Sequence, residues 1–340
     1  MTAATDNLPS EASPASFSPP PPHARHLACT PHSADRPDAR RSTRTGPRRG
    51  SLLALLALAG LLAACSPRQL LVQGVADALA TQGQADEEDL ALARDASPFY
   101  LKLSESLLKE SPGNLKLAQS VASGFTQYAY AFVASEAERL TATDAKQAHA
   151  LNERARRMYL RAHRHAMTAL ELSSAPGFTA RLMQPTAPPD AVLLRPEQVG
   201  LAYWGAASWG AAIALSKDDP DTVADLPAVV RLATWAAHTD PTHGHGALAS
   251  LMGTLEAARP GGSVAKASQW FDQAIALAAG TQAAPYVAKA EAIAQPGGDR
   301  PEFERLLRLA LAASAGRPDM SNQVMRARAQ WLLGMADDLF

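Results

Sequence analysis

The residue of this chain that is best placed for chemistry is Cys65, which directly follows the tripeptide Leu62-Ala63-Ala64. An apolar run at residues 52–64 ends in these small residues, and a basic cluster that includes Arg48 and Arg49 precedes the run. A charged, an apolar and a small-residue segment in this order are typical of an export signal. With a cysteine at the cleavage point, the pattern is a bacterial lipobox. We therefore predict that Cys65 is the lipidated first residue of the mature chain.

The alternative for residues 52–64 is a membrane-spanning anchor. The uncharged stretch between Gly50 and Arg68 is of marginal length for a bilayer span, which favours the lipobox. The chain has two cysteines, and Cys29 lies in the segment that would be removed. Once Cys65 is acylated, no thiol remains for a disulfide, a thiolate metal site or a nucleophile.

Three histidines lie close together in sequence at His238, His243 and His245. Imidazoles bind zinc, but no carboxylate stands at the spacing of a known metalloprotease motif. A histidine-dependent hydrolase also lacks a nucleophile and base in a recognisable arrangement. We therefore predict no catalytic residue, no metal and no cofactor, and a protein that is not an enzyme.

The composition divides the chain into three parts. Residues 1–50 are rich in Pro, Ser and Arg and are expected to be a disordered extension, residues 51–64 the signal segment, and residues 65–340 one mature domain. The 32 basic and 33 acidic residues leave a net charge of −1, so nucleic acid is not an expected partner.

The mature part is dominated by Ala and Leu at helical spacing, and strand-like alternation is absent. Ser97 and Pro98 predict a helix that begins at Pro98 and ends at Glu110. Residues 173–194 lack helical periodicity and predict a loop that is functional or mobile. Further helices are expected near residues 115–132, 144–172, 198–216, 284–294, 301–313 and 322–339.

The helix near 144–172 carries a stripe of arginines, namely Arg154, Arg157, Arg161 and Arg164. The stripe is either a docking surface for an acidic partner or lipid headgroups, or a solvated face. Acidic residues on the same side favour the solvated face.

The segment at residues 198–216 contains no charged residue but includes Tyr203, Trp204 and Trp209. Its Gly and Ser content favours a helix buried in protein over a second membrane span. The aromatic residues belong either to the core, which helical spacing favours, or to the wall of a ligand cavity. Charge concentrates directly after this helix at Lys217, Asp218 and Asp219, where helix capping is a sufficient explanation.

A repeat pattern indicates the architecture. Ala267, Phe271 and Ala274 match the second helix of a tetratricopeptide repeat, and Ala155 with Tyr159 begins a similar spacing. No copy keeps the full consensus, so we predict cryptic repeats. The expected fold is all-α, an array of antiparallel helical hairpins with extended binding surfaces.

The sequence resembles the T-component (TatT-like) lipoprotein family associated with TRAP transporters. The motifs that carry the resemblance are Phe125-Thr126-Gln127-Tyr128, Met158-Tyr159-Leu160-Arg161, Tyr203-Trp204 with Trp209, Leu215-Ser216-Lys217-Asp218-Asp219-Pro220, Gly244-His245-Gly246-Ala247 and Trp331-Leu332-Leu333. The resemblance implies an all-α protein of cryptic tetratricopeptide repeats that forms a homotrimer, with a pore or cleft in each protomer. In one departure, Ala249-Ser250 stands where the family would carry a histidine.

The resemblance implies a periplasmic partner, the solute-binding P component of a TRAP transporter. The expected function is that of a periplasmic lipoprotein that binds this component and a small apolar ligand. The alternative is a scaffold for envelope or pilus assembly. Ser66 after the lipidated Cys65 predicts anchoring to the outer membrane. The candidate ligand or partner residues are Tyr203, Trp204, Trp209, Lys217, Asp218 and Asp219.

Overall fold

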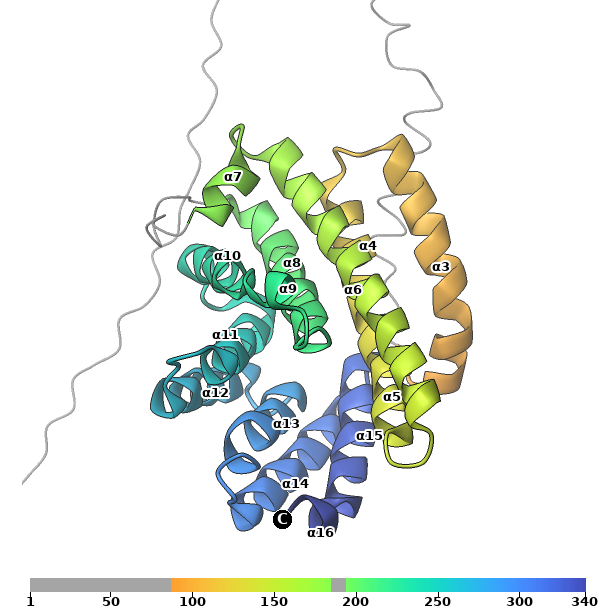
Figure 1. The fold of residues 1–340 in the computed structure, drawn as a ribbon, viewed down its shortest axis with the longest axis vertical. Helices are drawn as coiled ribbons and strands as arrows, with labels where there is room; N and C mark the ends of the chain where they lie inside the picture. Colours follow the sequence, from red (N-terminus) through yellow and green to blue (C-terminus); the bar gives the residue numbers. More distant parts are fainter. Residues whose placement is uncertain (1–86, 185–193) are drawn as a thin grey trace, which may run out of the picture. The chain divides into compact units, whose positions relative to one another are not determined.

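The computed structural model describes residues 87–184 and 194–340, and every regular element in these ranges is a helix (Figure 1). The prediction of an all-α fold is therefore confirmed. The predictions for the extension, the signal segment and Cys65 concern residues outside these ranges.

The helices follow one another with short connections. In the first part of the chain they are α3 (Leu90–Glu110), α4 (Leu115–Tyr128), the π-helical turn η2 (Ala129–Ala134), α5 (Ser135–Leu140), α6 (Ala145–Ser173), α7 (Phe178–Met183) and α8 (Pro196–Ala214). After them come α9 (Pro220–Val223), α10 (Leu226–Thr239), the 3-10 turn η3 (His243–Gly246), α11 (Ala247–Ala258), α12 (Val264–Ala278), α13 (Ala284–Lys289), the π-helical turn η4 (Ala290–Ala294), α14 (Arg300–Gly316), α15 (Met320–Gly334) and α16 (Ala336–Leu339). The helices expected near 144–172 and 284–294 are found at these places.

Many helix starts are fixed by a polar residue just before the first turn. Its side chain accepts hydrogen bonds from backbone N–H groups that have no partner within the helix, which contributes about 1 kcal/mol for each cap. These capping residues are Asp89, Asn114, Asp144, Asp219, Ser263, Asp299 and Asp319.

The predicted start of the first helix at Pro98 is wrong, because α3 begins at Leu90 and runs through Pro98. Asp89 caps this earlier start through hydrogen bonds from Ala91 N at 2.8 Å and Leu92 N at 3.1 Å. One face of α3 is buried both before and after the proline, at Ala93, Ser97, Leu101, Ser104 and Leu108. Continuous packing along this face offsets the hydrogen bond that an interior proline removes.

The expected loop at residues 173–194 contains a helix, so that expectation is also partly wrong. Gly177, with a φ of 79°, starts α7, and the carboxylate of Glu171 accepts hydrogen bonds from the backbone N–H groups of Gly177 and Thr179. Phe178 is fully buried and meets the ring of Trp235 edge-on at 5.7 Å. Six residues are too few for a periodic signal in the sequence. The rest of the segment, residues 185–193, lies outside the described ranges.

The aromatic helix α8 is buried between α6 and α10. A Cβ atom at Gly205 would lie 3.3 Å from Ala166 Cβ and 3.4 Å from Leu232 Cδ2, so the small residue permits the close approach of three helices. Within the described ranges, no helix has both the length and the apolar character that a membrane span requires.

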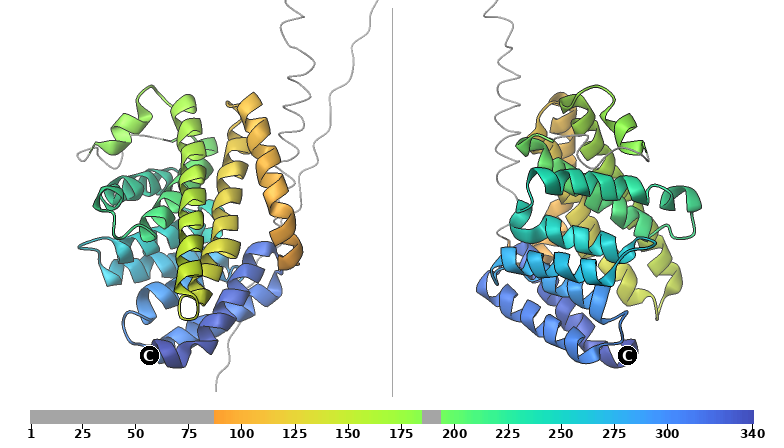
Figure 2. Two further views of the ribbon diagram at one scale, coloured as in Figure 1. Left: turned by 45° about the vertical axis from the view of Figure 1, so that its right-hand side comes forward. Right: turned by 90° about the vertical axis from the view of Figure 1, so that its left-hand side faces the viewer.

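Buried apolar side chains form two separate clusters. The larger one extends from Leu101 to Leu255 and joins α3, α4, α6, α8, α10 and α11. The smaller one extends from Ala283 to Leu332 and joins α13, α14 and α15. Figure 2 shows the later helices stacked in chain order from green to dark blue, and contacts between α11 and α13 connect the two parts of this stack.

Candidate functional site

A cavity of about 640 Å³ is lined by residues from helices of both clusters. One side is formed by α4, η2, α6 and α8, and the other by η3, α11, α13 and α15. This volume is in the range of pockets that hold small organic molecules. We call it the central cavity.

The lining of the central cavity is aromatic and polar but contains no Asp, Glu, Lys or Arg among the described residues. Four aromatic side chains belong to it, namely Tyr130, Tyr159, Tyr203 and Trp204. Neutral hydrogen-bonding groups come from Gln119, Gln127, Ser250, Thr254, Gln282 and Ser321. Such a wall suits an uncharged or apolar body with a few hydrogen-bonding groups, because a charge placed there would lose solvation without gaining an ionic partner.

Burial favours the neutral form of three tyrosines and of His243 in this wall. Burial raises the pKa of Tyr203 to about 12, and burial also raises the pKa of Tyr130 and Tyr159. Burial lowers the pKa of His243, an effect that the carboxylate of Asp240 at 3.7 Å opposes. At neutral pH the three tyrosines therefore act as uncharged hydrogen-bonding groups.

Two of the predicted aromatic residues lie together at this cavity. The rings of Tyr203 and Trp204 meet edge-on with their centroids 4.8 Å apart, and the ring of His243 lies 5.6 Å from that of Tyr203. The cavity therefore joins α8 to the Gly-His-Gly turn of η3.

The third predicted aromatic residue, Trp209, does not line the central cavity. It is only 6% exposed, packs 4.3 Å from the ring of His163 and is hydrogen-bonded to Asp225. Burial lowers the pKa of His163 to about 4, against the hydrogen bond to the carbonyl of Gly205, so this imidazole is neutral. Trp209 thus occupies a packed region of the larger cluster.

Lys217, Asp218 and Asp219 lie in the turn between α8 and α9, away from the cavity lining. The side chain of Asp219 accepts hydrogen bonds from the backbone of Asp221 and from the hydroxyl of Thr222 at 2.6 Å. This is the capping arrangement that the sequence suggests. The structure therefore does not bring these charged candidates together with Tyr203 and Trp204.

The Gly-His-Gly turn has an unusual backbone, because Gly244, His245 and Gly246 all have positive φ, at 63°, 51° and 96°. A Cβ atom at Gly246 would lie 2.4 Å from the carbonyl oxygen of Ala274 on α12. Glycine is therefore required at this position both by its φ and by close packing. The turn places His243 and His245 at the cavity.

We expect Gly246→Ala to lower the free energy of unfolding by about 2–4 kcal/mol, because it adds a steric overlap to an unfavourable φ. The matched control is Gly261→Ala, where φ is 71° but no atom lies within 4 Å of the added Cβ. That variant bears only the conformational cost, about 1 kcal/mol. Urea unfolding of both variants measures the difference, and equal losses would contradict the packing role of Gly246.

The residues that the sequence did not reveal are ionic. Glu105 on α3 is 4% exposed and binds Arg161, Lys102 at 2.7 Å and His165 at 2.9 Å. Burial works to raise the pKa of Glu105, but the hydrogen bonds from these three partners outweigh it and lower the pKa to about 2. Arg161 thus fixes α6 to α3, whereas the other members of the arginine stripe, Arg154, Arg157 and Arg164, are exposed, as a solvated face predicts.

A second ionic group connects α15 with the first half of the chain. Arg328 is largely buried and binds Glu138 on α5 at 2.7 Å, 190 residues away, as well as Glu291 on η4 at 3.0 Å. Its guanidinium group also lies 5.9 Å from the ring centroid of Tyr130 and 5.6 Å from that of Trp331. Arg328 therefore fastens α15 beside the wall of the central cavity.

The histidines do not form a metal site in the structure as described. Within residues 87–184 and 194–340, no three side chains of His, Cys, Asp or Glu are grouped so as to hold a metal ion. His243 interacts instead with Asp240, and His245 is exposed at the cavity.

The chain is similar to a known family and to a bacterial protein. The model of a family described as TRAP transporter T-component matches residues 86–340. A protein of Treponema pallidum (strain Nichols), described as uncharacterized, is 29% identical over 278 residues, which cover 78% of this chain and 85% of that relative.

Proposed function

Because the chain belongs to the TRAP transporter T-component family, we propose that it is a periplasmic lipoprotein that binds the solute-binding P component of such a transporter. The family match supports association with TRAP transporters, in an accessory role rather than as an enzyme. In this proposal the chain catalyses no reaction. It binds the P component through its surface and contains a ligand-binding site.

The central cavity carries the ligand part of the proposal. It is large enough for a small organic molecule, and its described lining is aromatic and uncharged. We infer that it holds the body of a small apolar ligand, in contact with Tyr203 and Trp204. The same wall includes Ser250, which belongs to the Ala249-Ser250 pair that stands where the family would carry a histidine.

The proposed assembly is a homotrimer of helical hairpins derived from cryptic tetratricopeptide repeats. The helical hairpins are supported by the packing of consecutive helices against each other, such as α11 with α12 and α14 with α15. The trimer is proposed from the family match. Closed cyclic symmetry would give one P-component site for each protomer.

Protein that begins at Ser66 is expected to sediment as a trimer and to form a heavier complex with the P component encoded beside its own gene. The control is a P component from an unrelated TRAP transporter, which should leave the sedimentation unchanged. The contrary result is a monomer that does not bind this P component at tens of micromolar, a concentration above the dissociation constant expected for a standard-size interface. It would favour the envelope-scaffold function instead.

The lipid anchor is proposed from Leu62-Ala63-Ala64-Cys65, and Ser66 in place of Asp favours the outer membrane. Cys65→Ser is expected to leave unprocessed precursor and to remove the mature protein from the outer-membrane fraction. Labelled fatty acid and fractionation measure both effects, and Cys29→Ser is the control that should retain label and location. A processed, membrane-bound Cys65→Ser protein would exclude lipidation at this residue.

A further inference from the structure

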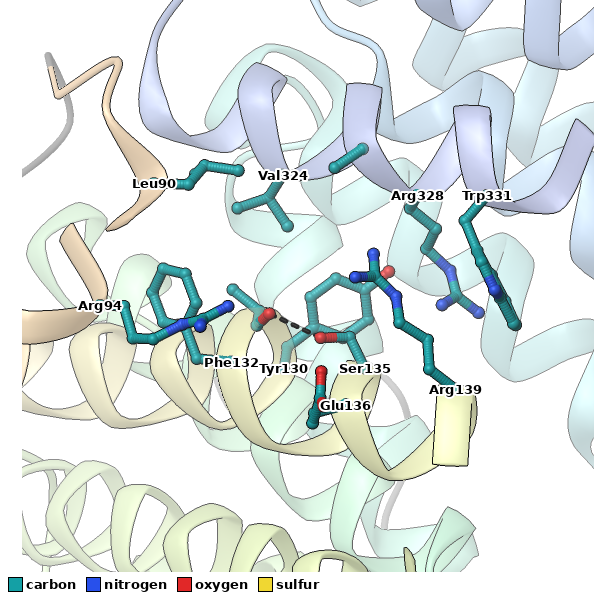
Figure 3. A pocket seen from close by; sticks show the side chains of 12 residues that line it. Leu90, Arg94, Tyr130, Phe132, Ser135, Glu136, Arg139, Val324, Arg328 and Trp331 are labelled. Carbon is teal, nitrogen blue, oxygen red and sulfur yellow. Dashed lines mark hydrogen bonds between the residues drawn. The ribbon is translucent and has the colours of Figure 1, made fainter. Parts of the chain in front are cut away.

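A second, smaller hollow of about 90 Å³ opens between α3, η2, α5 and α15 (Figure 3). Arg94 on α3 and Arg139 on α5 line it, together with the aromatic rings of Phe132 and Trp331. Figure 3 shows both arginines directed into the hollow from different elements. We call it the arginine notch.

Two of the three arginines that line the arginine notch form no ion pair in the described part of the chain. Arg328 also lines it, but Glu138 and Glu291 neutralise that guanidinium. Neither Arg94 nor Arg139 forms an ion pair with any acidic side chain in the described part of the chain, although Arg94 lies over the ring of Phe132 at 5.5 Å. Glu136 is the one carboxylate of the described lining, which holds three guanidinium groups.

The notch lies close to the central cavity, because a small cavity between them shares lining residues with both. A cavity of about 50 Å³ shares Tyr130, Gln127, Ser321 and Met325 with the central cavity. The same small cavity shares Tyr130, Ala131 and Val324 with the notch. Tyr130 therefore lines all three hollows, which follow one another along η2 and α15.

We propose that the arginine notch binds the carboxylate of a monoanionic, amphipathic ligand whose uncharged body extends along Tyr130 into the central cavity. This inference rests on the proposed ligand-binding function and adds the chemical class of the ligand. A guanidinium group binds a carboxylate through paired charge-assisted hydrogen bonds. Phe132 and Trp331 offer apolar surface to the carbon atoms next to the carboxylate.

The two hollows are suited to different parts of a ligand, the notch to an acid group and the central cavity to an uncharged body. The uncharged wall of the central cavity cannot neutralise an acid group, and the small notch cannot hold a long apolar chain. An amphipathic carboxylate satisfies both hollows at once, whereas a neutral molecule of the same length would leave Arg94 and Arg139 without an anion.

The test uses decanoate and its neutral counterpart 1-decanol, titrated calorimetrically into protein that begins at Ser66. Charge-assisted hydrogen bonds predict that Arg94→Gln with Arg139→Gln weakens decanoate binding by at least about tenfold. Binding of 1-decanol should change less than about twofold. Both arginines are exposed, so the fold should be retained, which thermal unfolding checks. Arg154→Gln, an exposed arginine of α6 outside both hollows, is the matched control and should change neither affinity.

The inference is overturned if the double variant weakens both probes equally or neither, or if the unaltered protein binds 1-decanol but not decanoate. It is also overturned if the double variant loses the P component and keeps decanoate, since the notch would then receive an acidic side chain of a protein. Ala207→Phe, which fills the central cavity, tests the proposed function separately. Unchanged binding of both probes to that variant would remove the central cavity as the ligand site, whatever the arginines do.

Discussion

Replacement of Trp209 with alanine is expected to lower the free energy of unfolding by about 3–5 kcal/mol, the cost of removing a large buried aromatic side chain. Its ring packs on His163 and its indole is hydrogen-bonded to Asp225, so the substitution leaves both a void and a half-buried carboxyl without that partner. Urea unfolding at neutral pH measures the loss.

The matched variant is Trp204→Ala, because Trp204 lies on the same helix but lines the central cavity and is only half-buried. It should cost about 1–2 kcal/mol, since the side chain already faces an open space. It should instead change the amount of ligand that the protein retains on purification. Similar stability losses for the two tryptophans would contradict the division between a packed residue and a cavity residue.

Replacement of Glu105 with glutamine is expected to cost about 3 kcal/mol at neutral pH. The pKa of this carboxyl falls from an ordinary 4.5 to about 2 in the folded protein, so its ionised form stabilises the fold. That contribution is fully present above pH 4.5 and is lost as the pH falls from 4.5 towards 2. The stability gap between parent and Glu105→Gln should therefore narrow over this range.

Glu153→Gln is the control for Glu105, because Glu153 also binds an arginine of α6 but its side chain is 35% exposed. A solvent-exposed pair of this kind contributes less than about 1 kcal/mol. Urea unfolding at several pH values compares the two variants. A gap for Glu105→Gln that stays constant down to pH 2 would mean that the carboxyl acts through packing rather than through its charge.

The sequence predicts the helices well where local signals agree. The helix at Ala145–Ser173 begins at a capping Asp144 and carries a regular apolar face, and both signals lie within the segment itself. The start of α3 was mistaken because Ser97 and Pro98 form a strong local signal, whereas the buried face that continues through them depends on α4. Local patterns thus predict helices, and tertiary packing corrects their ends.

The site could be predicted only in part, for a similar reason. Tyr203 and Trp204 stand out as aromatic residues in an uncharged helix, but Trp209 shares that pattern and packs elsewhere. The arrangement around Arg328 joins residues from three distant segments, so no spacing in the sequence indicates it. Arg94 and Arg139 are ordinary surface arginines until α3, α5 and α15 bring them to one hollow.

The division of the core into two hydrophobic clusters affects how a bound ligand changes the local stability of the protein. We expect each cluster to open separately, so that amide hydrogen exchange shows α13–α15 opening apart from α4, α6 and α8. A ligand in the central cavity would contact both of its sides. It would stabilise their closed arrangement, because separating them would lose the binding free energy. A docked partner could then distinguish a ligand-bound protomer by its reduced local opening, without contacting the ligand.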